Sequence, residues 1–234
     1  MGLGLGSTLS KGGVVTPGII TDNLVLKHMY GAGEVVPVSD GAAYFDGSDD
    51  KISLTETTRS VDDSAMTIAF WVNRSTVNTW DTILGHSSYE SYSWIAFDDD
   101  ADRVLIESLT NGNNVAGTIS PNMEANRWYH FALSLGTDGT GQWYQDGVAI
   151  STAGDLTDDF KYNQIATTAT THNHYGYLCN LAHWNATLTQ AQIKSIMWKN
   201  YAGLTDSEKT NLVSWWNLSA DANDSHGSNN GTLS

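Results

Sequence analysis

Acidic side chains gather in two short runs, and carboxylates grouped in loops are the ligands that Ca²⁺ prefers, because it takes six to eight oxygens. The denser run spans residues 98–102. It is not an EF-hand loop, since Arg103 stands at the glycine position and Leu109 at the bidentate glutamate position. The candidate ligands are Asp98, Asp100 and Asp102 in this run and Asp46, Asp49 and Asp50 in the other. We expect one Ca²⁺ in the chain, with a solvated acidic turn as the alternative for each run.

A second metal hypothesis concerns His172 and His174, which are separated by one residue. On a strand, side chains two residues apart point to the same side, so the two imidazoles could share a metal ion. The alternative is a pair of solvent-exposed polar histidines.

Aromatic residues surround a serine-rich segment over residues 86–93. Tryptophan and tyrosine faces can stack on the C–H surfaces of sugar rings, and loops often carry function. The candidate sugar-binding residues are Trp80, Tyr89, Tyr92 and Trp94. Core packing is the alternative, because aromatic residues also dominate the interiors of β-sandwiches.

The charge balance excludes two classes of partner. With 11 basic and 26 acidic residues, the net charge is −15. Such a chain repels nucleic acid and anionic membrane surfaces. No apolar run reaches the ~18 residues that a membrane span needs, and we expect no secretory signal in the glycine-rich start. The single cysteine, Cys179, predicts a buried thiol and no disulfide framework.

Short alternating segments separated by Gly, Asn and Asp turns predict an all-β, two-sheet antiparallel sandwich. In residues 66–72 every second residue is apolar and large, and Asp146-Gly147 predicts a hairpin turn. Capping boxes at Thr189 and Thr205 predict two short helices near the C-terminus. The expected organisation is a glycine-rich arm and first strand over 1–30, the sandwich over 31–200, and a helix, strand and tail over 201–234. The tail would pack on the same domain or on a neighbour.

Five segments, taken in order, resemble the motifs of laminin-G-like domains of the concanavalin A-like lectin and glucanase jelly rolls. They are Ala43–Ile52 (AYFDGSDDKI), Met66–Val72 (MTIAFWV), Trp128–Ala132 (WYHFA), Trp143–Val148 (WYQDGV) and Leu178–Leu188 with the helix after it. The resemblance implies a jelly roll and, in several such domains, one loop-bound Ca²⁺. The segment Leu212–Leu218 resembles one that usually opens these domains, whereas here it follows them.

The glycine-rich start and the segments at 20–26 and 35–41 are similar to bacteriophage virion proteins that carry such domains, especially marine ones. This resemblance implies a virion surface or tail location after synthesis in the host cytoplasm. Residues 1–30 would contact other virion proteins or further copies of the chain, and the outer loops would contact host glycans.

Catalysis is not expected. The glucanases of this fold carry acids that alternate along one strand, whereas Glu90, Glu107 and Glu124 each stand alone. No G-x-S-x-G elbow is present, and His130 lies in a segment whose counterpart is structural. The leading hypothesis is a non-enzymatic virion structural, decoration or tail-fibre protein with a lectin-like domain. A free carbohydrate-binding or adhesion module and a divergent glucanase are the alternatives.

Overall fold

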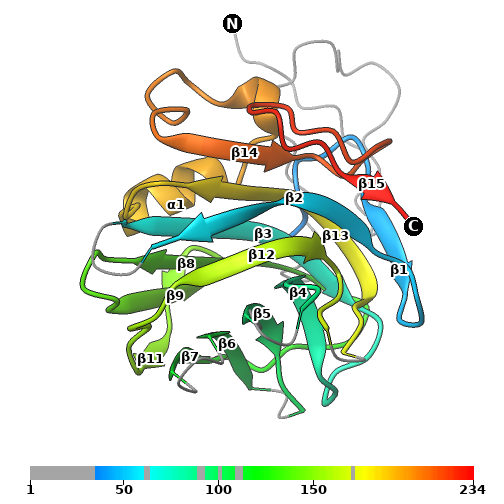
Figure 1. Ribbon diagram of the computed structural model, residues 1–234, viewed down its shortest axis with the longest axis horizontal. Coiled ribbons are helices and arrows are strands. Elements are labelled where there is room, and N and C mark those ends of the chain that lie inside the picture. The colour runs from blue at the N-terminus through cyan, green and yellow to red at the C-terminus, as the bar shows by residue number, and fades with distance from the viewer. Residues whose placement is uncertain (1–34, 61–63, 89–92, 100–101, 109–112, 170–171) are drawn as a thin grey trace, which may run out of the picture. The chain divides into compact units, whose positions relative to one another are not determined.

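The structure is a computed structural model that describes residues 35–60, 64–88, 93–99, 102–108, 113–169 and 172–234. Residues Val36–Ser234 form one compact unit (Figure 1). No helix among the described residues is long and apolar enough to cross a membrane. In chain order the elements are β1 (Ala43–Asp46), β2 (Ile52–Arg59), β3 (Met66–Arg74), β4 (Asp81–Gly85), β5 (Ser93–Phe97), β6 (Arg103–Ser108), β7 (Asn113–Thr118), β8 (Trp128–Leu135), β9 (Gly141–Gln145), β10 (Val148–Ala149), β11 (Ser151–Ala153), β12 (Phe160–Ile165), β13 (Tyr175–Trp184), α1 (Gln190–Ile196), the 3₁₀ helix η2 (Tyr201–Gly203), β14 (Leu212–Trp216) and β15 (Thr232–Leu233).

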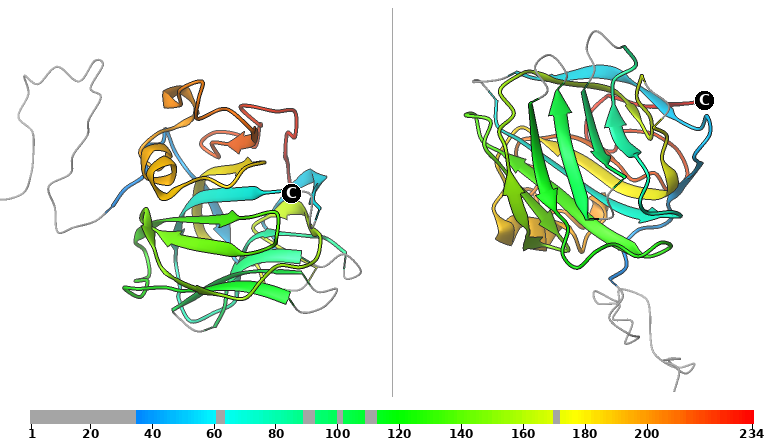
Figure 2. Two further views of the ribbon diagram at one scale, coloured as in Figure 1. Left: turned by 90° about the vertical axis from the view of Figure 1, so that its left-hand side faces the viewer. Right: turned by 90° about the horizontal axis from the view of Figure 1, so that it is seen from below.

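The strands form two antiparallel sheets that pack against each other, as the views in Figure 2 show. The seven-stranded sheet has the order β1-β13-β3-β8-β9-β10, with β14 also paired to β13. The eight-stranded sheet has the order β11-β7-β6-β5-β4-β12-β2-β15. The predicted all-β sandwich is therefore confirmed.

The hydrophobic core consists of side-chain rows that cross both sheets. In the eight-stranded sheet one row joins, through cross-strand pairs, Ile52, Ile165, Leu84, Ile95, Ile106 and Val115. In the other sheet Leu178, Val72 and Tyr129 form a row that belongs to the same buried cluster. Because side chains alternate along a strand, the neighbouring rows must point outward. Each sheet therefore has an outer face that is free to be covered or to bind.

The outer face of the seven-stranded sheet is covered at one end by α1 and the segment after it. Ala69 pairs with Ala132 and with Ala182, and these small residues cluster with Ile193 and Ile196 of the helix. Beside them, Trp71 Nε1 donates to the Met197 carbonyl at 3.0 Å. Small side chains let the helix approach the sheet closely, so both faces of β3 are buried here.

The first predicted C-terminal helix is confirmed, and the second is wrong. At α1 the reciprocal bonds of a capping box join Thr189 and Gln192. Thr205 and Glu208 make similar reciprocal bonds, with Thr205 N donating to Glu208 Oε2 at 2.8 Å, but residues 206–211 are turns. Asn211 then adopts φ 61°, and β14 begins at the next residue, which leaves no room for a helix.

Two further predictions from the sequence are confirmed. Asp146 and Gly147 connect β9 to β10 with φ values of 49° and 73°, as a tight hairpin turn requires. Cys179 is a free, fully buried thiol, and burial raises its pKa to about 12.

The C-terminal segment completes both sheets. Leu181 and Ala182 of β13 pair with Trp216 and Trp215 of β14, and β15 pairs with β2. Trp216 is buried in the core. Residues 201–234 therefore pack on the same sandwich as the strands that precede them.

Candidate functional site

The outer face of the eight-stranded sheet carries a row of residues centred on Trp94. Gln164 pairs with Gly85, Gly85 with Trp94, Trp94 with Glu107, and Glu107 with Asn114. Residues opposite each other on antiparallel strands share a face, so this row projects away from the core. The row crosses five strands of a packed sandwich, β12, β4, β5, β6 and β7, which makes this face a rigid support for a ligand.

Three rings on this face form what we call the Trp94 platform, defined as Trp80, Trp94 and His172. The two indoles are stacked, with their centroids 4.9 Å apart and an interplanar angle of 13°. The His172 ring lies 5.4 Å from Trp80 and 5.3 Å from Trp94. Trp94 is buried, whereas Trp80 and His172 are half-buried. Partial burial lowers the pKa of His172, because it disfavours the charged form of the ring.

The loop after β12 places His172 because it lies directly on β4. A Cβ atom at Gly85 would stand 2.3 Å from the Thr167 carbonyl oxygen and 2.7 Å from Thr168 Cβ, so a side chain there would displace the loop. The Ala169 amide donates to the His86 carbonyl at 2.9 Å and fixes this approach. Glycine at position 85 is therefore part of the construction of the platform.

Polar groups adjoin the rings. Trp94 Nε1 donates to Glu107 Oε2 at 3.2 Å, and Glu107 and its neighbour Asn114 are both half-buried. Ring faces can pack on the C–H surface of a sugar, while a carboxylate and an amide accept from and donate to its hydroxyls. Apolar surface with a few placed polar groups is the usual construction of a small-molecule site.

Two of the four predicted sugar-binding residues belong to the part of the chain that the structure describes. The structure brings Trp80 and Trp94 together, whereas Tyr89 and Tyr92 lie outside the described residues. The sequence reasoning did not assign His172 or Glu107 to this site. The register of β5 with β6 brings Glu107 to Trp94, and no local pattern in the sequence shows that register.

The acidic turn that we define as Asp46, Asp49 and Asp50 brings three carboxylates together, with one oxygen of each within 4.8 Å of the others. Within the turn, Asp50 Oδ2 accepts from the Asp46 amide at 3.0 Å, and Asp46 Oδ1 accepts from the Ser48 amide at 2.7 Å. Such a set of oxygens fits a hard cation with further water ligands.

The other predicted calcium run is arranged differently. Asp98 is buried, and its Oδ2 lies 3.1 Å from Arg103 Nη1, so an arginine already neutralises that carboxylate. Asp102 is half-buried, and Asp100 lies outside the described residues.

The two histidines of the predicted metal pair have separate surroundings. His172 belongs to the Trp94 platform, whereas His174 is fully buried and its Nδ1 donates to Asp81 Oδ1 at 2.5 Å. The other oxygen of Asp81 accepts from Arg74 Nε at 2.9 Å. This buried network anchors Asp81, which follows Trp80, and His174, which lies two residues after His172.

Residues 46–194, more than half of the 234-residue chain, match the laminin G-type family described as the concanavalin A-like lectin/glucanases superfamily. The chain belongs to this superfamily. The resemblance seen in the sequence is thus confirmed at the level of the family. No curated relative matches the chain.

Solved structures of this superfamily's fold resemble the chain at low identity. A candidate carbohydrate-binding protein from Bacteroides ovatus has a TM-score of 0.63 at 20% identity, over 82% of this chain and 57% of that one. The chain therefore spans little more than half the length of that protein. Domain 4 of the extracellular arabinanase AbnA from Geobacillus stearothermophilus, in complex with arabinotriose, has a TM-score of 0.53 at 17% identity, over 67% of this chain and 76% of that domain.

Glucanases give the superfamily part of its name, and hydrolysis of a glycosidic bond needs a pair of carboxylates. Along β6 the outward neighbours of Glu107 are Leu105 and Arg103, so no second acid alternates with it. Glu124 is exposed, and its Oε1 lies 3.7 Å from Arg127 Nη1. Glu90 lies outside the described residues. His130 is buried, and burial lowers its pKa to about 3.

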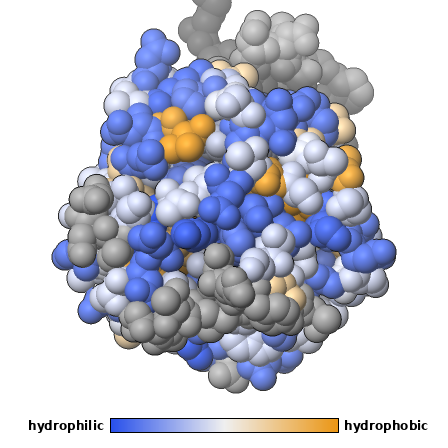
Figure 3. Space-filling view, in the orientation of Figure 1, coloured by the Kyte–Doolittle hydropathy of each residue, from blue (hydrophilic) through white to orange (hydrophobic). Residues whose placement is uncertain are grey.

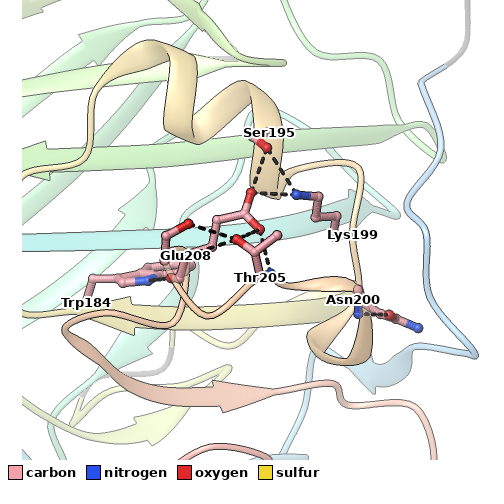
Figure 4. A network of polar contacts seen from close by, with 8 residues as sticks. Trp184, Ser195, Lys199, Asn200, Thr205 and Glu208 are labelled. Atoms are coloured by element: carbon pink, nitrogen blue, oxygen red, sulfur yellow. Dashed lines mark hydrogen bonds and ion pairs between the residues drawn. The ribbon is translucent and has the colours of Figure 1, made fainter.

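A second polar cluster, which the sequence reasoning missed, lies between α1 and the turns after η2 (Figure 4). Glu208 Oε1 lies 2.6 Å from both Lys199 Nζ and Ser195 Oγ, and its backbone carbonyl accepts from Trp184 Nε1 at 2.8 Å. Burial alone would raise the pKa of Glu208, but the hydrogen bonds lower it to about 2. The cluster borders a groove of about 220 Å³. Because both carboxylate oxygens of Glu208 are bonded to groups of the protein itself, the cluster has a structural role.

Proposed function

We propose that this chain is a non-enzymatic carbohydrate-binding domain that binds sugar on the Trp94 platform. The observation that carries the proposal is the stacked pair Trp80 and Trp94 with Glu107 bonded at its edge. The likeness to a candidate carbohydrate-binding protein and to an arabinanase domain in complex with arabinotriose supports the same class of ligand.

The charge of the protein favours a neutral sugar over an anionic one as the ligand. A net charge of −15 repels anionic polysaccharides, and the carboxylate beside Trp94 would lie close to any acidic group stacked there. Glycoside hydrolysis needs two facing carboxylates. We propose a binding site and not a hydrolytic one because Glu107 is the single acid in the row of residues centred on Trp94.

Replacing Trp80 tests the platform, because its ring is half-buried and can be removed at less cost to the fold than Trp94. With arabinotriose and neutral oligosaccharides of glucose and xylose as probes, calorimetry should show about tenfold weaker binding by Trp80→Ala. That is the change expected when about 60 Å² of apolar contact is lost. Trp198→Ala is the matched control, because Trp198 is 50% exposed and packs on Trp71 of the other sheet. Unchanged binding by Trp80→Ala, or cleavage of any probe, would contradict the proposal.

We also propose that the acidic turn binds Ca²⁺ and so stabilises the strand ends that it joins. Three clustered carboxylates support this assignment. Added Ca²⁺ should raise the melting temperature of the wild-type protein and not that of Asp49→Asn/Asp50→Asn. An equal rise in the two proteins would refute it.

The proposed setting of the domain is the surface or the tail of a virion, to which residues 1–30 attach it through other virion proteins or further copies of the chain. The glycine-rich composition of that segment and its resemblance to phage virion proteins support this proposal. Deleting residues 1–30 should abolish co-sedimentation with particles or self-association and leave sugar binding intact. Unchanged association after the deletion would refute it.

A further inference from the structure

At the end away from α1, no other element of the described residues covers the outer face of the seven-stranded sheet, and a row of aromatic rings lies there. Tyr44 pairs with Tyr177, Tyr177 with Asn73, and Asn73 with Trp128, so these four side chains share the outward face. Tyr175, two residues before Tyr177, points the same way. We call Tyr44, Tyr175, Tyr177 and Trp128 the tyrosine strip.

The rings of the tyrosine strip contact one another and are open to solvent. Tyr44, Tyr175 and Tyr177 are 48%, 38% and 41% exposed, and Trp128 is half-buried. The centroid of Tyr44 lies 4.9 Å from that of Tyr177 and 6.3 Å from that of Tyr175, and Trp128 lies 6.3 Å from Tyr177. Since the row crosses four strands, it is about 14 Å long, the length of a short oligosaccharide.

The core does not require these rings. The next residues along the same strands, Leu178, Val72 and Tyr129, supply the buried row. Several large aromatic side chains gathered at the surface of a chain usually indicate a binding surface.

The size and charge of the strip decide which partner fits. With ~200 Å² for each tyrosine side chain, the three tyrosines expose on the order of 250 Å², well below the ~800 Å² per partner of a stable protein interface. The acidic turn adjoins the strip, because Asp46 pairs with Tyr175, and its carboxylates repel anions. Ring faces with hydroxyls and the Asn73 amide beside them are suited to an uncharged, hydroxyl-rich chain.

We propose that the tyrosine strip is a second carbohydrate-contact surface, for neutral oligosaccharides, on the opposite side of the sandwich from the Trp94 platform. One domain could then bridge two glycan chains. This extends the proposed function to a new site and does not require that the Trp94 platform bind sugar.

The test compares Tyr44→Ala/Tyr177→Ala, Trp80→Ala and the wild-type full-length protein in native gels that contain arabinan, xylan, mixed-linkage β-glucan or dextran. Tyr44→Ala/Tyr177→Ala should bind a retarding polysaccharide about tenfold more weakly for each ring removed, since each ring buries about 60 Å² of apolar surface. Val148→Ala, at an exposed residue of β10, is the surface control, and melting curves confirm that each variant is folded. As a measurement free of substitutions, the same polysaccharide should protect Tyr44 and Tyr177 from nitration by tetranitromethane.

The outcomes separate the two sites. Weaker binding by both variants, with protected tyrosines, supports two surfaces. Weaker binding by Tyr44→Ala/Tyr177→Ala alone, with protected tyrosines, supports the strip and overturns the Trp94 platform. Weaker binding by Trp80→Ala alone, with unprotected tyrosines, overturns the strip and leaves the proposed function standing. No retardation of the wild-type protein by any of the four polysaccharides overturns the strip as stated here.

Discussion

Asp81 neutralises a buried arginine, and its replacement by alanine should strongly destabilise the domain. The side chains of Arg74 and Asp81 are 0% and 3% exposed, with Arg74 Nε 2.9 Å from Asp81 Oδ2. In Asp81→Ala the guanidinium stays buried against Phe97 and keeps a bond to the Thr79 carbonyl, but it loses its counter-charge. Removing one partner of a buried ion pair costs about 3–5 kcal/mol. At about 2–4 °C per kcal/mol, the melting temperature should fall by roughly 6–20 °C.

The assay is urea unfolding followed by tryptophan fluorescence, with thermal melting as a second measure. The informative control is Arg74→Met/Asp81→Leu, because replacing both charges by apolar groups is often close to neutral. This double variant should recover most of the stability that Asp81→Ala loses. If it is as unstable as Asp81→Ala, the loss comes from packing or from the unpaired His174 N–H, and the reasoning from an unpaired arginine charge is refuted. Sugar affinity should fall in Asp81→Ala as well, since Asp81 adjoins Trp80 and bonds His174.

Three further predictions follow from other contacts. Gly85→Ala should displace the 167–169 loop, cost about 1–3 kcal/mol and weaken sugar binding, because its Cβ would lie 2.3 Å from the Thr167 oxygen; unchanged stability and binding would contradict this. Because the pKa of Glu208 falls from 4.5 to about 2 on folding, its contribution to stability is complete above pH 4.5 and is lost as the pH falls through 2. Urea midpoints of Glu208→Gln should therefore depend less on pH in that window than those of the wild-type protein, and equal slopes would refute the assignment. Cys179, whose pKa burial raises to about 12, should resist Ellman's reagent in the native protein and react in denaturant; rapid native labelling would show that the thiol is accessible.

The strands that can be predicted from the sequence are those in which large apolar residues alternate with others along the chain. Residues 66–72 show large apolar side chains at every second position, and Asp146-Gly147 has the turn chemistry of a hairpin. Strand β12 was not predicted, because Asp158 and Asp159 precede it and Lys161, Asn163 and Gln164 give it the composition of a loop. Its inward residues, Phe160 and Tyr162, do show the alternation of a strand, and the pairing with β2 and β4 makes the segment a strand.

The candidate site was partly visible in the sequence for the same reason. Trp80 and Trp94 lie close enough in the chain to be grouped by inspection. His172 and Glu107 reach them through a loop–sheet contact and a strand register, and neither leaves a local pattern. The tyrosine strip is less visible still, because it joins residues more than 100 positions apart.

Figure 3 shows that one face of the molecule is largely hydrophilic, with small separate apolar patches. The edges of the strands, in contrast, have to be closed by pairing. One edge of β13 is shared between two partners, β1 over Tyr175–Leu178 and β14 over Leu181–Trp184. The second partner follows β13 in the chain and is therefore synthesised after it. Until residues 212–216 emerge, a nascent chain would expose half of that edge together with Trp184, a ready template for pairing with a neighbouring chain. Slow synthesis or premature termination near residue 205 should therefore cause aggregation of this protein.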